Sequence, residues 1–150
     1  MTRFVTKTEG KSREEAVQEQ FAATGNAAGF CSRALIEGET TIGYELVDLK
    51  SGRTVLCAML PDRIPSGWNE ELQHGKYSFS REGFAFAETI IDKALEDGAT
   101  VLFLDEIGKL ELKDSGFASL LQRCAASGSE LVIGCRRANI AKIREQFLTE

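Results

Sequence analysis

The chain has 150 residues, of which 43% are hydrophobic, and its 18 Lys and Arg against 23 Asp and Glu give a formal net charge of -5. This length supplies apolar material for one packed core, so residues 1–150 are expected to form a single domain. The acidic balance makes nucleic acid an unexpected partner, because affinity for it depends on clustered Lys and Arg that neutralise phosphates.

Neither a membrane partner nor export is expected. The apolar run at residues 101–104 is stopped by two acids, whereas a membrane helix needs about 20 apolar residues. Residues 1–16 mix charge into every turn, unlike the apolar centre of a secretory signal. A cytoplasmic location is therefore expected.

The cysteines are far apart in the sequence and form no CxxC pair. Each of them neighbours small or apolar residues, which favours buried and reduced thiols in a cytosolic core. The alternative is a metal site, which would need ligands from four separate elements. The residues concerned are Cys31, Cys57, Cys124 and Cys135.

The first half of the chain is rich in β-forming segments. A short β-like stretch, RFVTK, precedes a helical stretch, SREEAVQEQF. Residues 41–49 and 53–60 are two β-rich runs around the turn-forming KSG, which predicts an antiparallel hairpin that extends the main sheet. Residues 61–75 contain both prolines and have no clear period, so a loop over the ligand side of the sheet is expected.

The second half alternates helices with buried strands. Amphipathic periods of three and four residues predict the helices, and short continuous apolar runs predict strands that are covered on both faces. The helices are expected at 82–97, 114–126 and 138–148, and the strands at 100–105 and 130–135. This order predicts an α/β fold with a mostly parallel central sheet.

Two acids stand where such a sheet places its ligands, beyond the carboxyl end of a parallel strand. Asp105 and Glu106 directly follow the four apolar residues of the strand predicted at 100–105. This is the Walker B arrangement, in which the first acid orients water around Mg²⁺ and the second polarises the attacking water. An acidic start to a turn or helix explains the dipeptide equally well.

The N-terminal GKS triplet is the matching candidate for a Walker A phosphate loop. Lys11 would reach the β and γ phosphates, Ser12 would bind Mg²⁺, and backbone N–H groups would surround the anion. The residues predicted to bind nucleotide here are Thr8, Glu9, Gly10, Lys11 and Ser12. Val5 stands where the full pattern has its first glycine, and a β-branched residue resists positive φ. The loop is therefore expected to be either rebuilt or disabled.

Several segments together resemble one family. VDLKSG, HGKYSF and FLDEIGKLELK, followed by an amphipathic helix and LVIG, are similar to the small nucleoside-triphosphatases of the P-loop superfamily, the cancer-related NTPases. The resemblance runs from about Ala28 to Arg137 and is most specific in DEIGKLEL. It implies a three-layer P-loop-type sandwich and hydrolysis of ATP or GTP with Mg²⁺ as the cofactor.

The resemblance also implies roles for individual residues. Glu106 matches the general base and Lys11 the catalytic lysine of the phosphate loop, while Ser12 and Asp105 match the Mg²⁺ ligands.

Other polar residues have two interpretations each. Arg136, after the strand at 130–135, would contact the γ-phosphate or start a solvated helix. Lys76 and Lys109 follow motif segments and lie near the nucleotide by resemblance, although surface lysines explain them equally well. Trp68 would stack on a nucleobase or cover the edge of the core. His74 has no second His or Cys at ligand spacing, so no metal role is expected.

Two functions compete on these observations. The first is a hydrolase that binds a nucleoside triphosphate at residues 8–12 and uses Glu106 as its base. The second is a catalytically impaired relative that senses nucleotide or interacts with another protein, with Val5 as the discriminating residue. A small-molecule kinase uses the same chemistry, but the chain leaves little room for a lid. A homo-oligomer is compatible with either function.

Overall fold

In the computed structural model, which describes residues 1–148, helices alternate with strands at the N-terminus and after residue 80, and five consecutive strands lie between these two parts. The strands are β1 (Thr2–Val5), β2 (Ala27–Glu37), β3 (Thr40–Asp48), β4 (Thr54–Met59), β5 (Glu70–His74), β6 (Tyr77–Ser80), β7 (Val101–Ile107) and β8 (Glu130–Cys135). The α-helices are α1 (Arg13–Ala22), α2 (Arg81–Glu96), α3 (Lys109–Leu112), α4 (Ala118–Ala126) and α5 (Ile140–Phe147), with 3-10 turns η1 (Pro61–Arg63) and η2 (Arg137–Asn139). No helix within this described part is long and apolar enough to cross a membrane.

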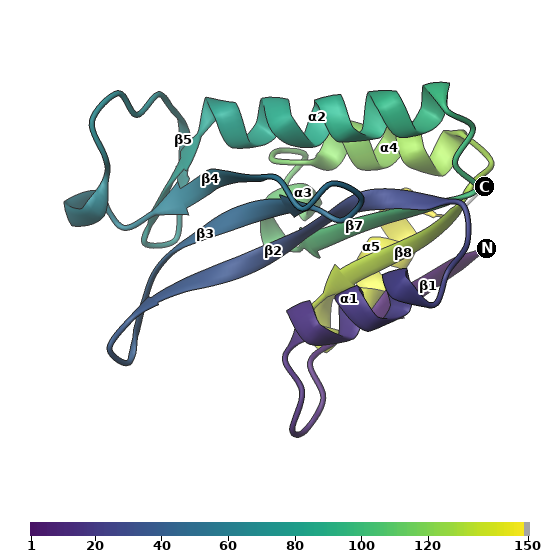
Figure 1. The fold of residues 1–150 in the computed structure, drawn as a ribbon, viewed down its shortest axis with the longest axis horizontal. Helices are drawn as coiled ribbons and strands as arrows, with labels where there is room; N and C mark the ends of the chain where they lie inside the picture. Colours follow the sequence, from purple (N-terminus) through teal and green to yellow (C-terminus); the bar gives the residue numbers. More distant parts are fainter. Residues whose placement is uncertain (149–150) are drawn as a thin grey trace.

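These strands form one mixed sheet in the order β1-β8-β7-β2-β3-β4-β6-β5. The strands from β1 to β2 in this order pair in parallel, and those from β2 to β5 pair antiparallel. Strand β2 is the border between the two halves, because its first residues pair with β7 and its later residues with β3. Figure 1 shows β2 and β3 continuing as a long hairpin beyond the parallel half.

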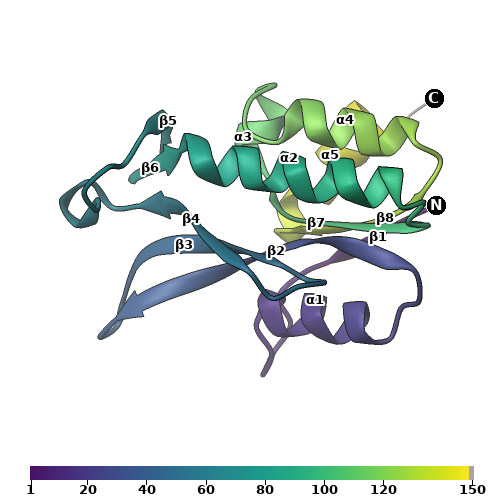
Figure 2. The same ribbon diagram turned by 45° about the horizontal axis from the view of Figure 1, so that its top comes forward.

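Helices cover both faces of the parallel half, which makes three layers. Helix α1 lies on one face, where Val17 packs with Val5 and Phe103. Helices α2, α4 and α5 lie on the other face, where their apolar sides share one core. Figure 2 shows α1 on the opposite side of the sheet from α2 and α4. Burial on both faces explains why β7 and β8 are continuous apolar runs.

The predicted α/β fold class is confirmed, together with the hairpin of β3 and β4 and the helix–strand order after residue 80. The antiparallel half is larger than the expected hairpin, since it also includes the second part of β2 and the pair β5–β6. All four cysteines are buried free thiols, as predicted.

Two predictions were wrong in detail. Residues 70–74, expected to belong to a loop, form strand β5. Their sequence, EELQH, is mostly polar and shows no strand pattern. It still forms a strand, because β5 lies at the edge of the sheet and pairs with β6 through its backbone. Helix α4 begins at Ala118 and not near Asp114, because both Asp114 and Gly116 adopt positive φ angles that no helix accepts.

Candidate functional site

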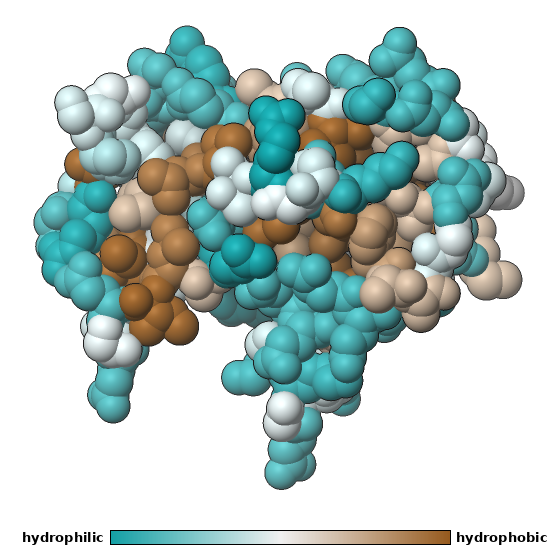
Figure 3. All heavy atoms as spheres, in the orientation of Figure 1, coloured by the Kyte–Doolittle hydropathy of each residue, from teal (hydrophilic) through white to brown (hydrophobic). Residues whose placement is uncertain are grey.

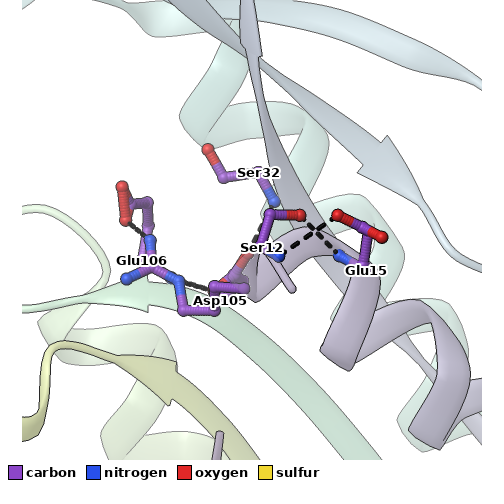
Figure 4. Close-up of polar contacts among 6 residues, drawn as sticks. Ser12, Glu15, Ser32, Asp105 and Glu106 are labelled. Atoms are coloured by element: carbon purple, nitrogen blue, oxygen red, sulfur yellow. Dashed lines mark hydrogen bonds and ion pairs between the residues drawn. The ribbon is translucent and has the colours of Figure 1, made fainter. Parts of the chain in front are cut away.

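The carboxyl end of β7 carries a buried carboxylate, Asp105, that is 1% exposed. One of its oxygens accepts a hydrogen bond from the backbone N–H of Ser32 at 2.9 Å, and the other accepts from the N–H of Glu106 at 2.9 Å. Figure 4 shows Asp105 between Ser32 and Glu106. The neighbouring strand makes room for this carboxylate with Gly134, where a Cβ would lie 2.0 Å from Asp105 Oδ1.

Glu106 follows in an unusual backbone conformation. Its φ is +64°, and the register between β7 and β8 shifts between Leu104 and Ile107, so the strand bulges at this residue. Non-glycine residues in the left-handed region carry strain and cluster at functional sites. The Glu106 side chain is 37% exposed, and burial raises the pKa of its carboxyl although the charge of Arg13 opposes the shift.

Arg13 is the cation that meets both acids. Its Nε lies 3.0 Å from Asp105 Oδ1, and its terminal nitrogen bonds to Glu106 Oε2. The Arg13 side chain is only 19% exposed, so the pair with Asp105 is largely removed from water. Because Arg13 is the first residue of α1, the helix start fixes the guanidinium at the carboxyl end of the sheet. Burial raises the pKa of Asp105 even so.

Arg13 was not among the residues predicted for the site. The GKS motif ends at Ser12, one residue before it. The sequence offered one signal for Arg13, namely an Arg directly after GKS at the start of a predicted helix. The strand before this helix belongs to the same sheet as the strand that carries Asp105 and Glu106.

The structure does not bring Lys11 to the acids. The Lys11 ammonium pairs with Glu19 on the surface of α1, and the Lys11 N–H bonds to the carbonyl of Thr8 in a tight turn. Thr8, Glu9 and Gly10 are exposed in this turn. The segment 6–12 projects away from the sheet as a narrow loop (Figure 1), and the protrusion is mostly hydrophilic (Figure 3).

Ser12 has a structural task at the start of α1. Its hydroxyl accepts from the N–H of Glu15 at 3.1 Å, and the Ser12 N–H donates to the Glu15 carboxylate at 3.1 Å. This reciprocal capping box is drawn in Figure 4. Val5, at the position where a phosphate loop has its first glycine, is a buried strand residue paired with Gly134. The predicted cradle of backbone N–H groups is therefore not formed in this arrangement.

The residues predicted to hold Mg²⁺ do not fit the ion in this geometry. Mg²⁺ needs open oxygen ligands in an octahedral shell that usually includes several waters. Both oxygens of Asp105 are engaged by backbone N–H groups and Arg13, and the Ser12 hydroxyl is engaged in the helix cap. Residues 1–148 contain no cluster of three or more His, Cys, Asp or Glu side chains that could hold a metal ion.

The other predicted residues divide into two groups. Arg136 follows β8 and lines the same cavity as Glu106, as do Lys76 and Lys109. Trp68 donates its indole N–H to the Ser78 hydroxyl at 2.9 Å and does not line that cavity, which supports its role at the edge of the core. Glu106 and Arg136 thus line one cavity, and residues 8–12 do not line it.

Comparisons with known proteins identify relatives. A family model described as NTPase matches residues 9–150. The nucleoside-triphosphatase THEP1 of Pyrobaculum aerophilum is 30% identical over 109 residues, which cover 73% of this chain and 57% of that protein. THEP1 of Archaeoglobus fulgidus is 28% identical over 106 residues, which cover 71% of this chain and 58% of that protein. The chain therefore spans little more than half the length of these curated relatives.

A solved structure supports the fold. The solution structure of a human cancer-related nucleoside triphosphatase matches with a TM-score of 0.63 and 21% identity, covering 97% of this chain and 84% of that chain. At this identity the likeness concerns the fold alone. The family model, however, matches most of the chain, and the chain belongs to the NTPase family.

Proposed function

We propose that this protein is a nucleotide-binding member of the NTPase family that does not hydrolyse Mg²⁺-bound nucleoside triphosphates. The observation that carries the proposal is the pairing of Arg13 with both Asp105 and Glu106. The archaeal relatives are named nucleoside-triphosphatases, which supports nucleoside phosphates as the ligand class.

Hydrolysis would need a free carboxylate at Glu106 and open metal-binding oxygens at Asp105, and the ion pair with Arg13 engages both side chains. A general base must lie within hydrogen-bond reach of the water that it activates, with a carboxylate free to accept the proton. The Glu106 carboxylate bonds to the guanidinium of Arg13 through Oε2, so this oxygen is engaged and not free to accept a proton from water. Burial raises the pKa of the Glu106 carboxyl, and the charge of Arg13 opposes that shift. Both oxygens of Asp105 are likewise engaged, by the charge of Arg13 and by two backbone N–H groups.

The loop before α1 supports the same conclusion. In a Walker A loop the lysine contacts the β and γ phosphates, and the following hydroxyl binds the metal. Here Lys11 is paired with Glu19 and Ser12 caps α1, so neither group is held ready for phosphate. The catalytically impaired relative is therefore favoured over the hydrolase.

A slow hydrolase is the second candidate, and the backbone of Glu106 is what favours it. A left-handed glutamate at a strand end is strained, and such strain is typical of catalytic and binding residues. If nucleotide binding drew Arg13 toward phosphate, Glu106 would become free to act as a base.

Turnover and binding measurements separate these possibilities. Phosphate release from ATP and GTP with Mg²⁺ is measured for the wild-type protein and for Glu106→Gln, and binding of ATPγS and GTPγS is measured by calorimetry. We expect phosphate release at background in both proteins, together with detectable nucleotide binding. Release by the wild type that Glu106→Gln abolishes would establish the hydrolase instead. Absence of binding would leave a protein-interaction role.

A further inference from the structure

Glu106 and Arg13 border a cavity that no residue of the loop 6–12 lines. The cavity has a volume of about 360 Å³ and lies between β3, the β5–β6 turn, the end of β7 and the segment after β8. Small-molecule sites usually have volumes of about 300 to 1,000 Å³ and combine an apolar lining with a few polar groups. The cavity is therefore large enough for a compact ligand.

The interior of this cavity is aromatic. Tyr44 and Tyr77 meet edge to face with ring centroids 5.4 Å apart, and both line it. Phe84 packs against Phe117 with centroids 5.1 Å apart, and these two rings also line it. Aromatic side chains stack on nucleobases with little dependence on which base is present. The interior thus suits a planar ring system.

Three cations lie at the rim of the cavity, which Glu106 and the buried Glu111 also line. Lys76, Lys109 and Arg136 line it and are exposed, and none of the three forms an ion pair with any residue in the range 1–148. Lys76 lies over the Tyr77 ring, 5.7 Å from its centroid, where it joins the cationic rim to the aromatic interior. Arg13, by contrast, is already neutralised by the two acids. Of these four basic residues, only Lys76, Lys109 and Arg136 have a positive charge available for an anion.

We infer that this cavity binds a nucleotide in its metal-free form, with the base among the aromatic rings and the phosphates on Lys76, Lys109 and Arg136. The inference rests on the proposed nucleotide binding and adds the place and the charge state of the ligand. Three basic side chains replace the neutralisation that a metal ion supplies in a Walker site. Mg²⁺ therefore competes with the rim for the phosphates and weakens binding.

Amide NMR spectra locate the ligand directly. ATP and AMP are titrated into the ¹⁵N-labelled protein, and three glycine amides act as reporters, namely Gly75 and Gly108 in the cavity wall and Gly10 in the projecting loop. We expect shifts at Gly75 and Gly108 and none at Gly10. Shifts confined to Gly10 would overturn the cavity assignment while leaving nucleotide binding intact. No shift anywhere would overturn both proposals.

Calorimetry with charge variants tests the rim. Lys109→Gln and Arg136→Gln should each weaken ATP binding about tenfold, because each removes a charged hydrogen-bond partner of phosphate. Lys113→Gln and Arg137→Gln are matched controls, since these exposed neighbours do not line the cavity. ATP should bind several-fold more tightly in EDTA than with Mg²⁺. Tighter binding with Mg²⁺, or equal effects of rim and control variants, would overturn the inference even if ATP binds.

Discussion

Arg13 and Asp105 form a largely buried ion pair between the start of α1 and the end of β7. Their closest atoms, Nε and Oδ1, are 3.0 Å apart, and the side chains are 19% and 1% exposed. Each side chain loses hydration when it is buried, and the attraction between the two charges offsets part of that cost. The fold therefore depends on the same contact that closes the acid pair.

Replacement of Arg13 by Met should destabilise the protein by about 3 kcal/mol, because removal of one partner leaves an uncompensated buried charge. Urea unfolding at neutral pH measures the loss.

The matched control is Arg33→Met. Arg33 pairs with Glu14 and Glu45 while 40% exposed, so its replacement should cost less than about 1 kcal/mol. Adding Asp105→Asn to Arg13→Met should recover part of the stability, since the more deeply buried of the two carboxylates that lose their partner is then neutral. Equal losses for the two arginine variants would mean that the Arg13 pair has no special weight.

Lys11→Ala should leave the affinity for ATP unchanged. In a Walker A loop this substitution removes a direct phosphate contact, but here the Lys11 ammonium pairs with Glu19, away from Asp105 and Glu106. Calorimetric titration of the wild type and the variant with ATP gives the comparison. A large loss of affinity would return the phosphate site to the loop before α1.

The predicted parts of the fold are those that local patterns encode. Helix α2 and strands β7 and β8 follow from periodicity and apolar runs, and the positions of Asp105 and Glu106 follow from the rule that ligands gather beyond parallel strands. Strand β5 was not predicted, because an edge strand can be polar on both faces. Only its pairing with β6 defines it as a strand.

The contact of Arg13 with the acid pair arises from the tertiary structure. Arg13 and Asp105 are remote in the sequence, and the GKS motif drew attention to Lys11 and Ser12. A sequence motif predicts a phosphate loop from residue types alone. The conformation of this loop also depends on Val5, which belongs to β1, so the turn begins after it. The position of the acid pair at the end of β7 could therefore be predicted from the sequence, but its pairing with Arg13 could not.

The cysteine thiols should be unreactive in the native protein. Burial raises the pKa of Cys31, Cys57 and Cys124 to about 12 and that of Cys135 to about 11. Because the thiolate is the reacting species, a disulfide reagent at pH 8 should label none of the four quickly and all four after guanidinium unfolding. A thiol that reacts at once in the folded protein would contradict the burial.

Gly134→Ala should destabilise the protein by about 2 kcal/mol through overpacking. The added Cβ would lie 2.0 Å from Asp105 Oδ1 and 3.2 Å from the Asp105 Cα, so the carboxylate would have to move away from its present partners. Gly25→Ala is the control, because nothing lies within 4 Å of a Cβ there and its φ is not positive. Urea unfolding should show a loss for Gly134→Ala and little change for Gly25→Ala. Equal stability of the two variants would show that Asp105 can move without cost. Contact with Gly134 of β8 would then not be needed to keep Asp105 beside Arg13.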